Sequence, residues 1–148
     1  RGYSDPEYIE HLAKIKLPFL PVGTHRAFPI KGDSMLPVKS GSYIVAKFIE
    51  DLRDIKDGRT YIVLSKSEGM VYKRVFKKLE EHNMLLMVSD NKKYDAYYLQ
   101  AEDVLEIWEF TCSINTQEYD EHELKISSIA SMLTQLGIEL KELEKSLQ

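Results

Sequence analysis

The chain has 148 residues, of which 43% are hydrophobic, so it is long enough for one hydrophobic core with a small appendage. No apolar run approaches the roughly 18 residues of a membrane span and no basic-then-apolar leader is visible, while a net charge of −4 argues against a DNA-binding surface on this chain. The single cysteine, Cys112, excludes an internal disulfide and fits a reducing, cytoplasmic setting, and the 4 scattered histidines predict neither a metal site nor a cofactor.

Residues 1–26 are rich in proline and read as an arm or linker that leads into a domain. The stretch "DPEYIEHLAKI" at residues 5–15 predicts a short helix, with Asp5 as its cap and Pro6 at the first helical position. The chain begins at Arg1 rather than at methionine, so we expect that an N-terminal portion of the protein precedes it.

Residues 27–114 consist of short runs rich in Val, Ile, Tyr and Phe, which are residues that favour strands. The turn signals "KSGS", "KDGR", "SEG", "EEHN" and "SDNKK" separate these runs. At least five strands are therefore predicted, in a mainly β domain of sandwich-like or barrel-like form.

Residues 115–148 begin with a polar stretch and continue as a predicted helix with a heptad pattern. The apolar positions are Ile126, Ile129, Leu133, Leu136, Leu140, Leu143 and Leu147. Steps of three and four along one narrow stripe are typical of a coiled coil, so we expect a homodimer joined through this helix. The alternative is an amphipathic helix that packs on its own domain.

Two side chains are candidates for catalysis. Ser34 lies in "KGDSMLP", where a serine is most often a turn former. Strand alternation in "GMVYKRV" places Lys73 on one face with Val71 and Val75, and an apolar setting lowers the pKa of a lysine. A neutral amine can take a proton from a serine, so Ser34 and Lys73 form a candidate dyad, although a strand lysine is usually solvated at its tip.

The motifs "GDSMLP", "SGSYIVAK", "DGRTYIVLS", "VYKRV" and "SDNKKY" follow one another over residues 27–110. In this order they resemble the peptidase domain that LexA, the lambda-type phage repressors and UmuD share. The resemblance implies a bent, mostly antiparallel LexA-like β fold. It also implies that Ser34 is the nucleophile, Lys73 is the general base, and the backbone amides of Asp33 and Ser34 stabilise the oxyanion.

The sequence departs from this family at two places. The family cuts an Ala-Gly or Cys-Gly bond in its linker, and this chain contains neither dipeptide; Arg1-Gly2 is the nearest candidate. Lys92 in "SDNKKY" replaces a proline that is commoner there, which affects a turn and not the dyad. Either the scissile bond lies upstream of this chain or this member does not cleave itself.

Three functions are compatible with the motifs. The first is the C-terminal regulatory domain of a helix-turn-helix repressor, which dimerises, cuts its own linker peptide, and reaches DNA only through an absent N-terminal domain. Whether such cleavage needs a co-protease filament is left open. The second is a dimerisation module of the same fold without cleavage. The third is a signal peptidase-like enzyme, which the lack of a membrane span disfavours.

Overall fold

The computed structural model describes residues 16–118 and 120–135, and it confirms the expectation of a mainly β protein. Contacts divide the chain into two units, residues 1–116 and 117–148. The strands are β1 His25–Pro29, β2 Tyr43–Ile49, β3 Arg59–Ser65, β4 Gly69–Lys78, β5 Met84–Val88, β6 Tyr97–Gln100 and β7 Val104–Ile114. The helices are the 3-10 turns η2 Leu52–Asp54 and η3 Ala101–Asp103, and α2 Leu79–His82 and α3 Glu121–Gln135.

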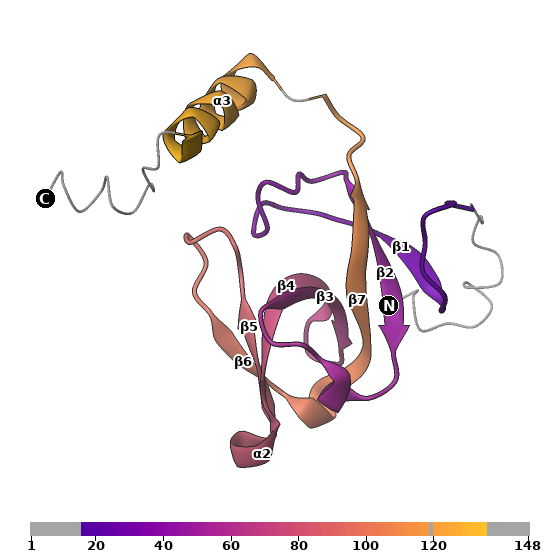
Figure 1. The fold of residues 1–148 in the computed structure, drawn as a ribbon. Coiled ribbons are helices and arrows are strands. Elements are labelled where there is room, and N and C mark those ends of the chain that lie inside the picture. Colours follow the sequence, from indigo (N-terminus) through magenta and orange to yellow (C-terminus); the bar gives the residue numbers. More distant parts are fainter. Residues whose placement is uncertain (1–15, 119, 136–148) are drawn as a thin grey trace, which may run out of the picture. The chain divides into compact units, whose positions relative to one another are not determined.

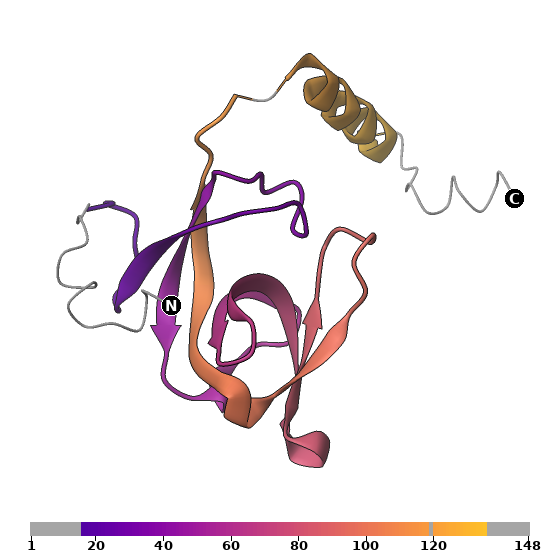
Figure 2. The ribbon, with the colours of Figure 1, turned by 180° about the vertical axis from the view of Figure 1, so that it is seen from behind.

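All seven described strands belong to one antiparallel sheet with the order β1-β2-β7-β3-β4-β5-β6. The last strand, β7, lies between β2 and β3 and so joins the early and middle parts of the unit (Figure 1). Its pairing shifts register opposite Val45/Ala46 and opposite Leu64/Ser65. Such irregularities bend a strand, and the sheet curls strongly in both ribbon views (Figures 1 and 2).

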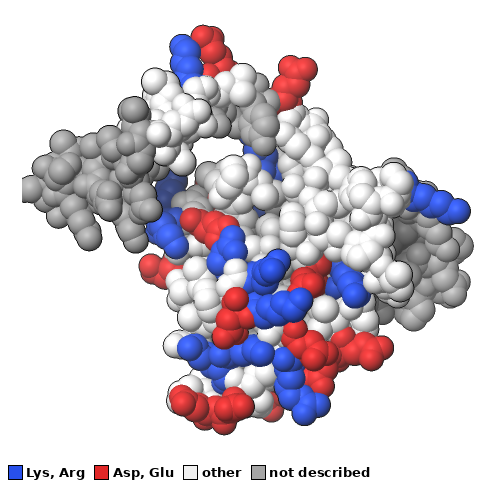
Figure 3. Space-filling view, in the orientation of Figure 1, with Lys and Arg blue, Asp and Glu red and all other residues white. Residues whose placement is uncertain are grey.

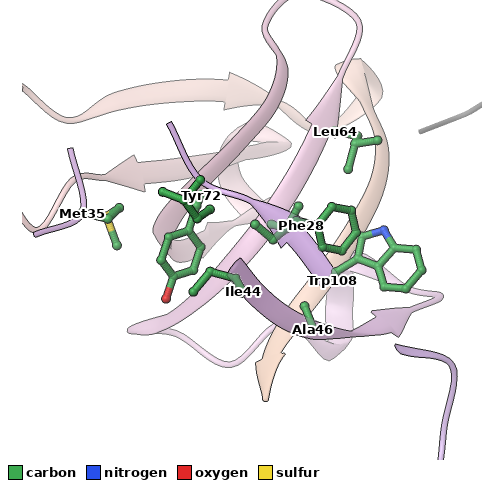
Figure 4. Close-up of a cluster of buried hydrophobic side chains, with 9 residues drawn as sticks. Phe28, Met35, Ile44, Ala46, Leu64, Tyr72 and Trp108 are labelled. Atoms are coloured by element: carbon green, nitrogen blue, oxygen red, sulfur yellow. The ribbon is translucent and has the colours of Figure 1, made fainter. Parts of the chain in front are cut away.

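Two hydrophobic clusters hold the sheet together, because alternate residues of its strands point to opposite faces. The first cluster contains Phe28, Ile30, Met35, Ile44, Ala46, Ile62, Leu64, Tyr72 and Trp108 (Figure 4). The second contains Ile55, Tyr61, Val63, Val75, Leu85, Met87, Leu99 and Ile107. The central strand β3 contributes to both, which explains why residues 61–65 are buried without a break.

Trp108 is the largest fully buried side chain and anchors the first cluster. The rings of Phe28 and Phe48 each lie 5.2 Å from it in edge-on arrangements. The guanidinium of Arg26 stacks over the indole at 4.8 Å from the ring centroid. This aromatic cluster fixes β1 and β2 against β7, and β1 leads directly into the loop that carries Ser34.

The second unit contains helix α3, which coincides with the first part of the predicted heptad stretch. Ile126, Ile129 and Met132 are each more than half exposed on it. The heptad positions beyond residue 135, and the helix predicted for residues 5–15, lie outside the described residues. None of the described helices is long and apolar enough to cross a membrane.

Candidate active site

Ser34 lies in the loop between β1 and β2, close to the buried edge of the first cluster. Gly32 opens this turn with a φ of +83°, a conformation that glycine adopts without strain, and its N–H donates to Ser40 Oγ at 3.3 Å. One residue after the serine, Met35 is only 3% exposed and packs in the first cluster. The turn therefore holds Ser34 half-buried at the surface, between a flexible glycine and an anchored methionine.

Lys73 lies in the middle of β4 and is 8% exposed. Its side chain is on the same strand face as Val75, as alternation predicts. The Lys73 Nζ donates to Ser89 Oγ at 2.8 Å and lies 6.0 Å from the ring centroid of Tyr94. Burial lowers the pKa of Lys73, while the carboxylate of Glu68 acts in the opposite direction. The amine therefore loses its proton more easily than an ordinary lysine does.

The loop after β5 holds the serine turn by direct hydrogen bonds. Asn91 donates from its backbone N–H to the Ser34 carbonyl and from Nδ2 to the Asp33 carbonyl, both at 2.9 Å. The Tyr94 hydroxyl donates to the Asp33 carboxylate, and this interaction raises the pKa of the Tyr94 phenol. Figures 1 and 2 show the β1–β2 and β5–β6 loops at the same end of the β unit.

The same loop is also attached to the lysine strand. Ser89, which is 2% exposed, accepts from Lys73, and the next residue, Asp90, forms a two-pronged ion pair with Arg74 at 2.8 and 2.7 Å. The pairing lowers the pKa of Asp90 and keeps its carboxylate charged. The Asp90 N–H also contacts Met35 Sδ at 3.2 Å. Residues 89–94 thus connect the strand of Lys73 with the turn of Ser34.

The loop of residues 89–94 contacts both predicted site residues, Ser34 and Lys73, but these two side chains do not form a hydrogen bond with each other. Within residues 16–118 and 120–135, Lys73 Nζ donates to Ser89 rather than to Ser34. The direct contact of Ser34 with Lys73, and the oxyanion role of the Asp33 and Ser34 amides, therefore stay predictions. General-base contacts are often loose before a substrate binds, so this geometry is compatible with the dyad.

Sequence reasoning missed Ser89, Asn91 and Tyr94 as parts of the site. All three belong to "SDNKKY", which sequence analysis used only as a mark of resemblance and of a turn. One signal was available: Ser89 continues the alternation of the buried Leu85 and Met87. A serine at the end of a core-facing row must find a polar partner, and Lys73 is that partner.

A pocket of about 330 Å³ shares Met35, Arg74 and Asp90 with the support of this site, but neither Ser34 nor Lys73 lines it. It is lined by Met35, Pro37, Val38, Arg59, Thr60, Tyr72, Arg74, Asp90, Glu109, Phe110 and Ser113. Tyr72 and Arg74 flank Lys73 in sequence, so they point to the opposite face of β4. Among the residues that the structure describes, no cluster of His, Cys, Asp and Glu side chains could hold a metal ion.

The geometry is that of a curled antiparallel β domain in which a turn serine and a buried strand lysine share one supporting loop. The family model described as Peptidase S24-like matches residues 3–109. The chain belongs to this family, which includes the C-terminal domains of LexA, UmuD and phage repressors. The resemblance predicted from the motifs is thus confirmed. No curated protein matches the chain significantly.

Proposed function

We propose that the chain is the C-terminal regulatory and dimerisation domain of a LexA-like or phage-repressor-like transcriptional regulator. In this proposal Ser34 and Lys73 cut the linker to an N-terminal DNA-binding domain. The observation that carries it is the buried Lys73 amine, held by Ser89 on the same loop that binds the Ser34 carbonyl. Membership in the peptidase S24-like family supports this assignment.

The chemistry follows from the two side chains. Ser34 Oγ adds to the scissile carbonyl carbon while neutral Lys73 Nζ takes the hydroxyl proton. The carbon–nitrogen bond then breaks, and the lysine ammonium gives this proton to the leaving amine. Water then attacks the resulting serine ester and gives a proton to Lys73, and the lysine ammonium returns this proton to Ser34 Oγ as the ester carbon–oxygen bond breaks.

An open strand edge supports an extended peptide as the substrate. β4 pairs with β3 from Gly69 to Val75, but its pairing with β5 begins only at Arg74. In the described strands, one edge of β4 between Gly69 and Lys73 is therefore without a neighbour. An extended linker peptide can add along such an edge through main-chain hydrogen bonds, which would bring its carbonyl groups beside Lys73.

The DNA contact in this proposal comes from the N-terminal domain and not from this chain. On the face drawn in Figure 3, Lys and Arg side chains of the β unit are interspersed with Asp and Glu. Two tethered half-site readers bind DNA at high effective concentration, and cutting the linker returns each to weak binding. The proposal therefore needs a dimer in the cytoplasm, with a co-protease filament as an optional trigger.

A second copy of the chain is the proposed partner of helix α3. Ile129 is 57% exposed, and apolar surface left in water forfeits about 25 cal/mol for each square ångström. We expect sedimentation to show weaker self-association when residues after Asp120 are deleted, or when Ile129→Asp is introduced. Ser131→Asp, at an exposed position off the seam, is the matched control and should leave the dimer intact. An unchanged dimer in the deletion would assign the interface to the β unit.

Labelling of the chain with a fluorophosphonate tests the peptidase function directly. Ser34 Oγ would displace fluoride from phosphorus, with its proton going to Lys73, and mass spectrometry would locate the adduct. We expect labelling at Ser34 that rises with pH through the lowered pKa of Lys73, and none in Ser34→Ala or Lys73→Ala. Ser113→Ala should label normally. Undiminished labelling of Lys73→Ala would refute the dyad.

The alternative is a non-cleaving regulatory module of the same fold. It predicts a dimer that fluorophosphonate does not label at any pH. A signal peptidase-like enzyme is the weaker alternative, because the family model that matches the chain is the peptidase S24-like one. Incubation of the full-length gene product in alkaline buffer separates these functions, since only the first yields two fragments without an added substrate.

A further inference from the structure

Asn91 binds the backbone on both sides of Ser34. Its Nδ2 donates to the carbonyl of Asp33, and its own N–H donates to the carbonyl of Ser34, each at 2.9 Å. These carbonyls belong to the two peptide units that flank the Ser34 Cα. Asn91 therefore fixes the orientation of both peptide planes at the candidate nucleophile.

This orientation determines where the Ser34 N–H points. The Asp33 carbonyl and the Ser34 N–H share one planar trans peptide unit, in which the two groups point in opposite directions. Because Asn91 holds the carbonyl, the N–H points away from Asn91. Within the described part of the chain, this N–H donates to no protein group. An N–H that is rigidly aimed and unused is what a developing oxyanion requires.

Asn91 is itself held from two directions. Two residues earlier, Ser89 accepts from Lys73, and between them Asp90 is paired with Arg74 on β4. On its other side, Asn91 Oδ1 accepts from the Lys93 N–H at 3.1 Å, which closes a local turn. Asn91 thus connects the strand of Lys73 with the peptide unit between Asp33 and Ser34, so the position of the strand helps to set the orientation of that peptide unit.

We propose that Asn91 is a positioning residue for the Ser34–Lys73 reaction, which aims the Ser34 N–H at the oxyanion. This inference rests on the proposed peptidase function and adds a residue to it. Asn91 does not touch the reacting atoms and transfers no proton. Its loss should slow the chemical step, while the protonation of Lys73 and the binding of a ligand should change little.

The variant Asn91→Asp isolates the critical hydrogen bond. Aspartate has the same shape, keeps an oxygen acceptor for the Lys93 N–H, and keeps the backbone N–H that binds Ser34. It replaces the Nδ2 donor to the Asp33 carbonyl by a negatively charged oxygen. Asn91→Ala loses the same donor without adding charge, so it serves as the second variant. Asn83→Asp makes the same chemical change at an exposed left-handed position and is the control.

The experiment measures fluorophosphonate labelling of Ser34 as a function of probe concentration and pH. We expect the maximal labelling rate to fall by about tenfold to a hundredfold in Asn91→Asp and Asn91→Ala, since one lost oxyanion donor costs up to about a thousandfold in enzymes. The half-saturating concentration should stay within about twofold, and the pH midpoint of Asn91→Ala should match that of the unmodified chain. Asn83→Asp should behave as the unmodified chain.

The outcomes separate this inference from the function on which it rests. If the unmodified chain labels at Ser34 and both Asn91 variants label at the same maximal rate, the positioning role is wrong and the dyad stands. If the variants lose labelling only in proportion to unfolded protein, seen by circular dichroism, Asn91 is merely structural and the inference is also overturned. If no chain labels at Ser34, the proposed peptidase function fails and the role of Asn91 fails with it.

Discussion

The turn that carries Ser34 and the strand that carries Lys73 are built by different forces. Lys73 belongs to β4, where ladder bonds to β3 on one side and packing in the second cluster fix its backbone. Ser34 belongs to no strand or helix, and its backbone is held by Asn91, from a distant part of the chain. The lysine is therefore placed by regular secondary structure, and the serine by a few specific tertiary bonds.

This difference predicts how each half of the candidate site responds to change. A strand residue in the middle of a ladder keeps its position when one neighbour is altered, because many equivalent hydrogen bonds remain. A turn held by single side-chain bonds shifts when one of them is lost. Mutations around Lys73 should therefore change its chemistry, whereas mutations around Ser34 should change its geometry.

The largest effect is expected from Lys73→Met, which keeps the length of the side chain and removes the amine. Labelling of Ser34 should fall by at least about a hundredfold, the usual contribution of a general base. Lys77→Met, on the same strand and the same side, should retain labelling. Comparable losses in both variants would mean that β4 matters only as a scaffold.

The variant Lys73→Met should also change how the free energy of unfolding depends on pH. Burial lowers the pKa of Lys73 in the folded chain, so between this value and the ordinary 10.5 the unfolded chain binds more protons than the folded chain. Relative to Lys73→Met, the unmodified chain should therefore gain free energy of unfolding as the pH rises across that window. An identical pH dependence in urea titrations of both chains would show that the native lysine titrates normally.

The second prediction compares the substitution of a core residue on the serine turn with the substitution of a core residue on a strand. Met35→Ala and Ile44→Ala both remove buried atoms from the first cluster, so each should lower the free energy of unfolding by about 2–5 kcal/mol. Only Met35→Ala should also slow labelling of the protein that remains folded, because Met35 anchors the serine turn. Denaturant unfolding and labelling in the same buffer measure both quantities. Equal losses of labelling in Met35→Ala and Ile44→Ala would show that Met35 has no specific role in holding the serine turn.

A smaller effect is expected from Tyr94→Phe, which removes the hydroxyl that donates to Asp33 and keeps the ring near Lys73. The Asn91 bonds remain, so the maximal labelling rate should fall only about twofold to fivefold, as for a single net hydrogen bond. Tyr98→Phe, an exposed tyrosine on β6, is the control. If Tyr94→Phe lost as much labelling as Asn91→Asp, the hydroxyl of Tyr94 would hold the serine turn as strongly as Asn91 does.

The smallest effect is a shift in pH dependence caused by Glu68→Gln. The Glu68 carboxylate, which accepts from the Tyr97 hydroxyl at 2.8 Å, raises the pKa of Lys73 against the larger effect of burial. Its removal should move the midpoint of the labelling curve to lower pH, with an unchanged plateau. Glu80→Gln, on the exposed helix α2, should leave the midpoint unchanged. A shift to higher pH would contradict this electrostatic assignment.

The sequence by itself determined the parts of this protein that follow from local periodicity. Alternation in β4 placed Lys73 beside Val75, turn residues separated the strands, and the serine motif together with the lysine motif indicated the family that the family model confirms. These features depend on residues a few positions apart, where backbone geometry fixes which side chains share a face. The heptad pattern predicted a helix, and α3 occupies its described part.

Only the tertiary structure decided which side chains complete the candidate site. Asn91 meets Asp33 across 58 residues of sequence, and Ser89 meets Lys73 across 16. The tertiary structure also placed the pocket on the face of β4 that carries Tyr72, which is opposite to the face that carries Lys73. Such contacts depend on how the whole sheet curls and where its loops return, which no local period encodes. A side chain's hydrogen-bonding groups can be read from its residue type, but its partner is set only when the chain closes around it.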